Sequence, residues 1–141
     1  MKLFETVRGT IERFDVKGRG ILTKNGKTVA TNFVVPGDEV TATLTGRGGG
    51  ELRGTLTELH SPASERTMPR CPYVGKCGGC AWQMVDYTAQ LAYKRELVNK
   101  TFETANLPIT ISAVEPSPEI FFYRNRMDYV FGADGQLGLK A

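Results

Sequence analysis

The chain has 141 residues, of which 40% are hydrophobic and 23% are charged, and its formal net charge is +3 at pH 7. These values are typical of a globular protein with one ordinary domain or two small ones. No stretch approaches the ~18 apolar residues that span a bilayer, and the start, MKLFETVRGT, lacks the apolar segment of a secretory signal. We therefore expect a cytoplasmic monomer without a membrane partner, whose mild positive charge permits contact with nucleic acid but does not require it.

Residues 1–60 are predicted to form short β-strands separated by turns. Asn25-Gly26 is a hairpin signal, Pro36-Gly37 favours a second turn, and the glycine run 48–50 favours a third. Five strands in so short a segment favour a small OB-like barrel, because closing the sheet leaves no unpaired edge. Barrels of this kind often bind oligonucleotides, although a β module for another ligand fits these signals equally well.

A linker, a cysteine-rich loop and a helix are predicted next. Residues 61–83 begin with prolines and small polar residues and then contain all three cysteines, whereas residues 84–107 have helical periodicity. Asp86 can cap the start of this helix and Asn106 can end it. The apolar stripe that we expect to pack on the barrel or on the cysteine-rich loop consists of Leu91, Val98, Phe102 and Ala105.

Residues 108–141 are predicted to be the start of a second β-rich domain. PITISAVEPSP contains one β run, and FFYRNRMDYVFG and LGLKA are expected to be strands of a hairpin around Asp134-Gly135. The last strand is expected to stop in mid-element. Alternation along a strand would place Arg124 and Arg126 on one face. The fold class predicted for the whole chain is mainly β with one helix.

Cys71, Cys77 and Cys80 have the spacing C-x5-C-x2-C, with two glycines between the last pair. In a reducing compartment, closely spaced cysteines indicate metal or redox chemistry more often than disulfides. Two thiolates separated by two residues can reach one metal centre, and glycines permit a tight loop with amide-to-sulfur hydrogen bonds. Zinc with His60 as a fourth ligand is an alternative, whereas a dithiol oxidoreductase would need a βαβ unit that the sequence does not indicate.

Three motifs in this order carry a resemblance to a known family. They are C-x5-C-G-G-C-x-x-Q from Cys71 to Gln83, D-Y-x-x-Q-L-x-x-K from Asp86 to Lys94, and F-x-Y-R-N-R from Phe121 to Arg126. With the preceding barrel, they make the chain closely resemble the N-terminal portion of bacterial RNA 5-methyluridine (uracil-C5) methyltransferases. The resemblance implies a TRAM domain, which is a small RNA-binding barrel, then a loop that holds a [4Fe-4S] cluster, then a central β domain. A final domain of the family binds S-adenosylmethionine and carries out methyl transfer.

The resemblance also implies which residues are present and which are not. Cys71, Cys77 and Cys80 match three of the four cysteines that bind the family's cluster, and the fourth has no counterpart here. The family's nucleophilic cysteine and its carboxylate base belong to the final domain, so no catalytic residue is expected in this chain. We expect an RNA-binding and [4Fe-4S]-binding portion of an rRNA or tRNA uracil-C5 methyltransferase that is inactive alone. The alternatives are a stand-alone TRAM protein with a structural metal loop and a radical S-adenosylmethionine protein, whose usual cysteine spacing is C-x3-C-x2-C.

Contacts to RNA are expected from cations, because their attraction for phosphate is largely independent of sequence. Ordinary solvated side chains, and for the last two an ion pair with Asp128 or Glu119, are the alternatives. Tyr73 and Trp82 flank the cysteines and are expected to shield a cluster from water rather than stack on bases. The candidate RNA-binding residues are Arg13, Lys17, Arg19, Lys24, Lys27, Arg47, Arg124 and Arg126.

Overall fold

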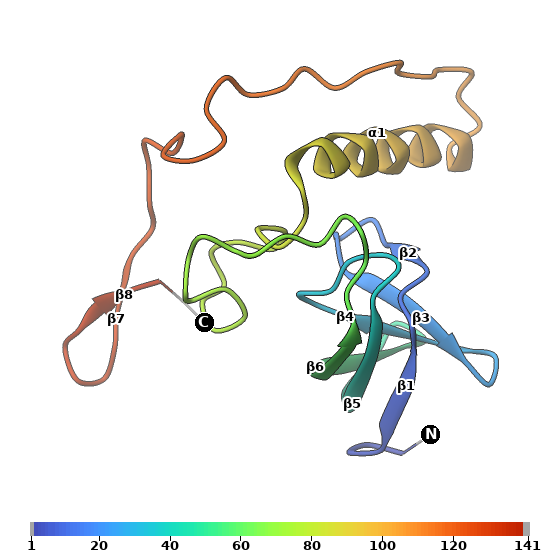
Figure 1. Cartoon of the computed structure of the whole chain (residues 1–141), viewed down its shortest axis with the longest axis horizontal. Coiled ribbons are helices and arrows are strands. Elements are labelled where there is room, and N and C mark those ends of the chain that lie inside the picture. The colour runs from blue at the N-terminus through green and yellow to red at the C-terminus, as the bar shows by residue number, and fades with distance from the viewer. Residues whose placement is uncertain (1, 140–141) are drawn as a thin grey trace.

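The protein is described by a computed structural model that covers residues 2–139. Six strands form one sheet in the order β1-β5-β6-β4-β3-β2, in which β4 and β6 are parallel and the other neighbours are antiparallel. β1 and β2 lie at opposite edges of this sheet but are consecutive in the chain, so the sheet closes on itself into an OB-like barrel (Figure 1). The predicted barrel is confirmed, with six strands where five were expected. Its strands are β1 (Thr6–Thr10), β2 (Arg13–Phe14), β3 (Gly20–Lys24), β4 (Lys27–Thr31), β5 (Glu39–Gly48) and β6 (Glu51–Ser61).

The turns of the barrel lie where the glycines predict them. Asn25 and Gly26 join β3 to β4 with φ values of 51° and 69°, and two consecutive positive φ values produce the twist that a two-residue hairpin needs. Gly49 and Gly50 join β5 to β6 in the same way, with φ values of 61° and 80°. Gly37, at 93°, follows Pro36 in the turn before β5. All three predicted turns are confirmed.

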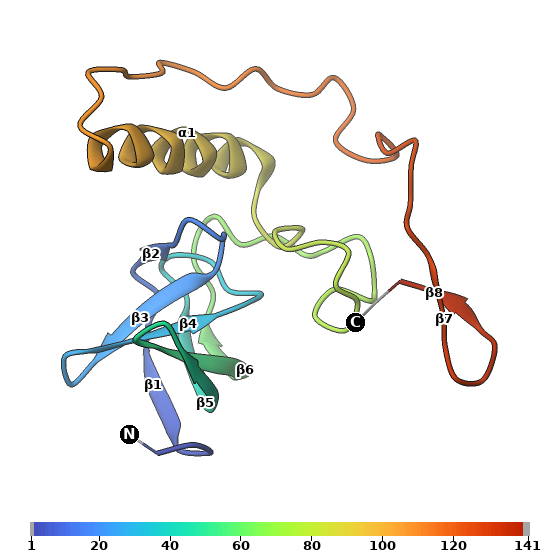
Figure 2. The ribbon, with the colours of Figure 1, turned by 180° about the vertical axis from the view of Figure 1, so that it is seen from behind.

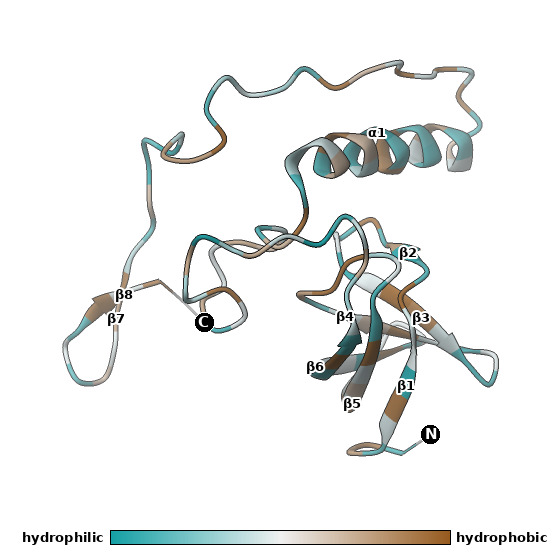
Figure 3. Cartoon of the chain, viewed as in Figure 1, coloured by the Kyte–Doolittle hydropathy of each residue, from teal (hydrophilic) through white to brown (hydrophobic). Residues whose placement is uncertain are grey.

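The barrel has its own hydrophobic core. Side chains alternate along its strands, and Figure 3 shows hydrophobic and hydrophilic bands succeeding one another along β1 and β5. Gly20 and Gly54 allow the strands to approach, since a Cβ atom on Gly20 would lie 2.2 Å from a methyl of Val34. The buried cluster consists of Val7, Ile11, Leu22, Val29, Val34, Val40, Leu44 and Leu52.

The helix α1 (Tyr87–Thr104) lies across one end of the barrel (Figure 1). As predicted, Asp86 caps it, because its carboxylate accepts hydrogen bonds from the backbone amides of Thr88 and Ala89. The side chains that pack toward the barrel are Ala89, Tyr93 and Leu97.

The predicted apolar stripe of this helix is wrong. Val98 is 39% exposed and Ala105 is also exposed, while Leu91 and Phe102 are only partly buried. The segment that follows α1 runs back beside the helix instead. There the side-chain amide of Asn99 forms hydrogen bonds with the backbone carbonyl and the backbone amide of Ile111. The helix face that packs on the barrel instead includes Tyr93. Because tyrosine carries a polar hydroxyl group, it did not count as an apolar residue in the helical periodicity of the sequence.

The segment after α1 runs back along the helix and then leaves the barrel, as both views show (Figures 1 and 2). β7 (Val130–Phe131) and β8 (Leu137–Gly138) form a short hairpin around Asp134-Gly135, which confirms that prediction. The strands predicted in PITISAVEPSP and across Phe121 to Met127 are absent from the described residues, because no sheet edge lies beside them to accept their backbone hydrogen bonds. No helix in residues 2–139 combines the length and apolar character needed to cross a membrane.

Candidate nucleic-acid interface and cysteine loop

The cysteine loop, residues 71–83, is closed by the side chain of Gln83. Its amide oxygen accepts a hydrogen bond of 2.6 Å from the backbone N–H of Cys71, and its amide nitrogen lies 3.7 Å from the sulfur of Cys80. The sulfur of Cys77 accepts a hydrogen bond of 3.3 Å from the backbone N–H of Gly79. Gln83 therefore joins the two ends of the loop, and two of the three sulfurs face hydrogen-bond donors.

The three thiols are free in this structure, and Cys80 is exposed while Cys71 and Cys77 are half-buried. Within residues 2–139, no three His, Cys, Asp or Glu side chains are grouped so as to hold a metal ion. The predicted cluster site is therefore not assembled here, although N–H···S hydrogen bonds of the kind described above are typical of thiolate-bound clusters. The chemistry of the donor set, three cysteine thiols, fits an iron-sulfur cluster.

His60, the alternative zinc ligand, lies on the barrel. Its Nε2 is 2.7 Å from the hydroxyl of Thr41, and its Nδ1 is 3.5 Å from the carboxylate of Glu58. The side chain is 18% exposed. The hydrogen bond to Thr41 connects β6 to β5.

Trp82 docks the cysteine loop onto the barrel. Its indole N–H donates a hydrogen bond of 2.7 Å to the carbonyl of Gly18, between β2 and β3. Its ring stacks on Phe14 with 4.4 Å between centroids, and Tyr93 of α1 meets the Phe14 ring edge-on at 5.0 Å. Trp82 thus packs against a second hydrophobic core that joins barrel, loop and helix. Tyr73, the other aromatic residue near the cysteines, is 64% exposed.

The β2–β3 loop, residues 15–19, is ordered by the side chain of Asp15. One carboxylate oxygen accepts hydrogen bonds from the backbone amides of Lys17 and Arg19, and the other accepts two from the Arg19 guanidinium. Burial acts to raise the pKa of Asp15, but these hydrogen bonds outweigh it and leave the pKa below its ordinary value. Arg19 also pairs with Glu51 at 2.6 Å, and the hydrogen bond to Asp15 raises the pKa of the Arg19 guanidinium.

The candidate RNA-binding cations therefore fall into two groups. In the first group the guanidinium of Arg19, 16% exposed, is held by two carboxylates. Arg124 and Arg126 are exposed but have partners, since Arg124 donates to the carbonyl of Gly79 at 3.3 Å and Arg126, 85% exposed, pairs with Asp128 at 3.2 Å. Arg124 and Arg126 do not lie on a strand, so the predicted alternation between them is wrong. The other candidates have exposed side chains on the barrel: Arg13 on β2, Lys17 in the β2–β3 loop, Lys24 and Lys27 beside the β3–β4 turn, and Arg47 on β5.

Sequence reasoning missed two further arginines. The guanidinium of Arg66 binds the buried carboxylate of Asp38 and the carbonyl of Phe33, which fastens the segment after β6 to the barrel. Arg70 lies 5.2 Å and 4.9 Å from the ring centroids of Phe121 and Phe122, next to the cysteine loop. Both lie in the segment predicted as a linker, where the sequence carries no signal that a long-range partner exists.

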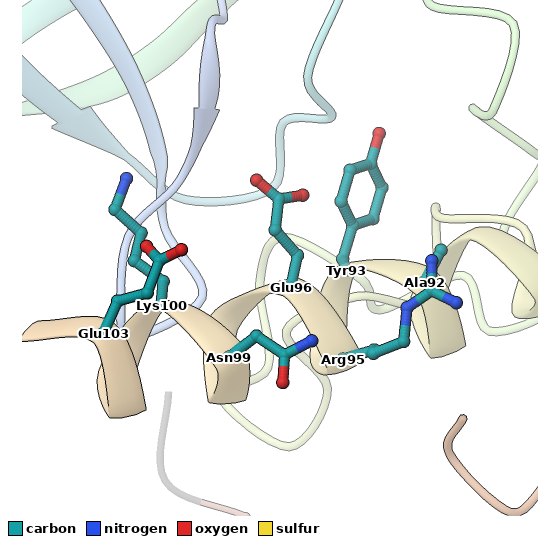
Figure 4. Close-up of a pocket in the computed structure, with 7 residues that line it drawn as sticks. All are labelled: Ala92, Tyr93, Arg95, Glu96, Asn99, Lys100 and Glu103. Atoms are coloured by element: carbon teal, nitrogen blue, oxygen red, sulfur yellow. The ribbon is translucent and has the colours of Figure 1, made fainter. Parts of the chain in front are cut away.

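A shallow groove runs along α1 and is lined by residues of that helix between Ala92 and Glu103 (Figure 4). Tyr93, Glu96 and Lys100 point toward the barrel strands, and Arg95 and Asn99 point to the opposite side of the helix. The charges are mixed, and Arg95 and Asn99 already bind backbone groups of Ser112 and Ile111. This groove presents no set of groups arranged for catalysis.

Comparison with curated proteins finds relatives described as RNA methyltransferases. The chain is 38% identical over 116 residues to an uncharacterized RNA methyltransferase of Thermotoga maritima, which covers 82% of this chain and 26% of that protein. It is 35% identical over 138 residues to a 23S rRNA (uracil(747)-C(5))-methyltransferase of Pyrococcus furiosus, covering 95% of this chain and 30% of the relative. A 23S rRNA (uracil(1939)-C(5))-methyltransferase of Vibrio vulnificus is 42% identical over 85 residues, 60% of this chain and 19% of its own.

The fold agrees with these relatives. A solved structure of the tRNA (uracil-54, C5)-methyltransferase of Pyrococcus abyssi, in complex with S-adenosyl-L-homocysteine, superposes with a TM-score of 0.68 and 29% sequence identity. The superposition covers 94% of this chain and 28% of that one. No family model matches the chain.

The OB-like barrel, the cysteine loop and the helix α1 are thus similar to a part of proteins described as RNA methyltransferases. Relatives of the chain include RNA uracil-C5 methyltransferases, and the chain spans between about a fifth and a third of the length of the relatives described above.

Proposed function

We propose that these 141 residues are the RNA-binding portion of an S-adenosylmethionine-dependent RNA uracil-C5 methyltransferase that acts on rRNA or tRNA in the cytoplasm. Two observations together support this proposal: the kind of relatives that the chain has, and the exposed cations on its barrel. Relatives that match most of the chain are uracil-C5 methyltransferases of rRNA and tRNA, and the matching region folds as a barrel with exposed cations. Binding RNA is a function that such a barrel can perform without a catalytic domain.

The chemistry assigned to this portion is recognition. Lysines and arginines with exposed charged groups attract phosphates and release counterions, which gives affinity and orientation without reading sequence. Lys17, Lys24 and Lys27 have exposed side chains on barrel loops, where an RNA backbone can approach. The residues described here include no counterpart of the family's nucleophile or base, so methyl transfer is assigned to other parts of such enzymes.

Titration of the purified chain with RNA tests this proposal. We expect an unmodified tRNA transcript or an rRNA stem-loop to bind weakly and with an affinity that falls with salt, and no methyl group to reach either RNA. Each neutralised phosphate contributes ~0.7–0.9 to the slope of log affinity against log salt concentration, and the small charge excess predicts a shallow slope. Absence of RNA binding at low salt would contradict the proposal, and so would methyl transfer by this chain alone.

We also propose that Cys71, Cys77 and Cys80 hold a [4Fe-4S] cluster. Support comes from their spacing and from the hydrogen-bond donors that Gly79 and Gln83 direct at two of the sulfurs. When bound, the cluster would supply a rigid thiolate-bound centre around which the loop can order. A three-cysteine set leaves one iron without a ligand from this chain.

Anaerobic reconstitution with iron and sulfide tests the cluster assignment. We expect brown protein with broad visible absorption that bleaches in air, since an iron without a protein thiolate is open to attack by oxygen. Replacing any of the three cysteines by serine should reduce the iron bound. Colourless protein with one tightly bound zinc per chain would instead favour a structural zinc loop in a stand-alone RNA-binding protein. Reductive cleavage of S-adenosylmethionine by the reconstituted chain would favour the radical-enzyme alternative.

A further inference from the structure

Trp82 connects two regions that have separate roles in the proposed function. On one side it continues directly into Gln83, whose side chain closes the cysteine loop by binding Cys71 and approaching the sulfur of Cys80. On the other side its ring and N–H contact Phe14 and Gly18. Trp82 thus links the cysteine loop to the residues around Gly18.

Trp82 packs closely against Gly18, which leaves no room for a side chain at position 18. Gly18 has φ of +74°, and a Cβ atom there would lie 3.1 Å from Nε1 of Trp82 and 3.3 Å from two of its ring carbons. Gly18 also supplies the carbonyl that accepts the indole hydrogen bond. A side chain at this position would strain the backbone and would contact the Trp82 ring. The neighbouring residue Lys17 has an exposed side chain, and Asp15 fixes its backbone amide.

We propose that Trp82 is a positioning residue through which the cysteine loop sets the conformation of the β2–β3 loop, so that both loops form one RNA-contacting unit with Lys17 at its edge. This inference rests on the proposed function, because it specifies which part of the barrel RNA contacts and what controls it. An ordered cysteine loop holds Trp82 against Gly18 and presents Lys17 in one conformation. When the cysteine loop is disturbed, Trp82 leaves Gly18. Lys17 then loses the fixed orientation in which it contacts RNA together with the other exposed cations of the barrel.

Trp82 is the single tryptophan of the sequence, so its fluorescence reports this contact without any RNA. Iodoacetamide added to the reduced chain alkylates the exposed thiol of Cys80 first. We expect alkylation to shift the Trp82 emission to longer wavelength as the indole leaves Phe14 for water. An unchanged spectrum after complete alkylation of Cys80 would overturn the coupling, whether or not the chain binds RNA.

RNA binding is the second readout, measured with the same tRNA transcript. Gly18→Ala leaves the cysteines intact but displaces the indole, and we expect it to weaken binding by at least about threefold, in the range of couplings between contacting residues. The slope of log affinity against log salt concentration should fall by about 1, as on removal of Lys17 itself. Gly135→Ala is the matched control, because Gly135 also has positive φ, at +77°, but has nothing within 4 Å of its Cβ position.

A double-mutant cycle distinguishes positioning from a general loss of structure. In a Lys17→Ala background, Gly18→Ala should cause little further loss of affinity, since the contact that it misplaces is already gone. Trp82→Phe keeps a ring to stack on Phe14 but lacks the N–H donor, so it should bind RNA with intermediate affinity, and alkylation of Cys80 should no longer change that affinity. Full additivity of Lys17→Ala and Gly18→Ala would overturn the proposal, as would wild-type affinity of Gly18→Ala. If the wild-type chain binds no RNA while alkylation still shifts the emission, the proposed function fails and the coupling stands.

Discussion

The carboxylate of Asp38 is completely buried and is bound by the guanidinium of Arg66 through three hydrogen bonds of 2.7–3.1 Å. The same carboxylate accepts hydrogen bonds from the backbone amides of Val35 and Ala63. One buried charge thus joins the turn before β5 to the segment that leads from the barrel into the cysteine loop. The orientation of that loop relative to the barrel depends on this ion pair as well as on Trp82.

We expect Arg66→Ala to lower the free energy of unfolding by about 3–5 kcal/mol, because it leaves the Asp38 carboxylate buried without its cation. Urea denaturation measures this loss. Arg8→Ala is the control, since the Arg8–Glu39 ion pair has 60% and 41% of its side chains exposed and should contribute less than about 1 kcal/mol. Equal losses for the two variants would show that the Asp38–Arg66 pair does not stabilise the fold.

A methyl group at Gly20 should destabilise the barrel. Its Cβ atom would lie 2.2 Å from Val34 and 2.9 Å from Ile11 inside the core, and overpacking of this kind typically costs about 1–3 kcal/mol. Gly9→Ala makes the same chemical change on β1, where the nearest atom would be 3.7 Å away in Leu22. Thermal denaturation should therefore show a lower Tm for Gly20→Ala and a nearly unchanged Tm for Gly9→Ala. A similar Tm for both variants would contradict the packing described here.

Acid should weaken the β2–β3 loop through Asp15. The pKa of Asp15 in the folded protein lies below its ordinary value of 3.8, so its ionised form stabilises the fold above about pH 4. That contribution is lost as the pH falls through the folded-state pKa, where the carboxylate takes up a proton. Free energies of unfolding of the wild-type chain and of Asp15→Asn should differ at pH 6 and converge toward pH 3. A difference that stays constant with pH would exclude this role for the carboxylate.

Charge reversal should separate the cations that bind RNA from those that hold the barrel together. Lys17→Glu combined with Lys24→Glu should weaken RNA binding strongly while leaving Tm nearly unchanged, because both side chains are exposed. Arg19→Glu should lower Tm, since it would place a third carboxylate beside Asp15 and Glu51. Filter binding at several salt concentrations, with thermal denaturation in parallel, measures both effects. Unchanged affinity of the lysine double variant would shift the expected contact to Arg13 and Arg47.

Local signals predicted the barrel well because its turns are specified by neighbouring residues. Asn25-Gly26 determines the β3–β4 hairpin by its backbone preference alone, and Asp86 determines the start of α1 through its own side chain. Both features need no information from distant parts of the chain.

Long-range contacts were not predictable in this way. Nothing near Asp38 in the sequence indicates that Arg66 will reach it, and nothing near Gly18 indicates Trp82. The strand expected around Arg124 failed for a related reason, since alternation predicts a strand only where a partner strand accepts its hydrogen bonds. The face of α1 that packs on the barrel also depends on a distant residue, because Tyr93 contacts the ring of Phe14.

The order of the strands has a consequence for synthesis on the ribosome. Thr6 of β1 pairs with Thr43 of β5, and Val29 of β4 pairs with Leu52 of β6, so β1 and β4 each wait for a partner strand that emerges later. Loop closure over such separations is slow compared with formation of the local β3–β4 hairpin. Until Ser61 has left the exit tunnel, Val7 and Leu22 remain in an open, apolar sheet that is prone to pair with other nascent chains. Slow translation near Gly49-Gly50 would prolong that exposure, whereas rapid delivery of β6 would shorten it.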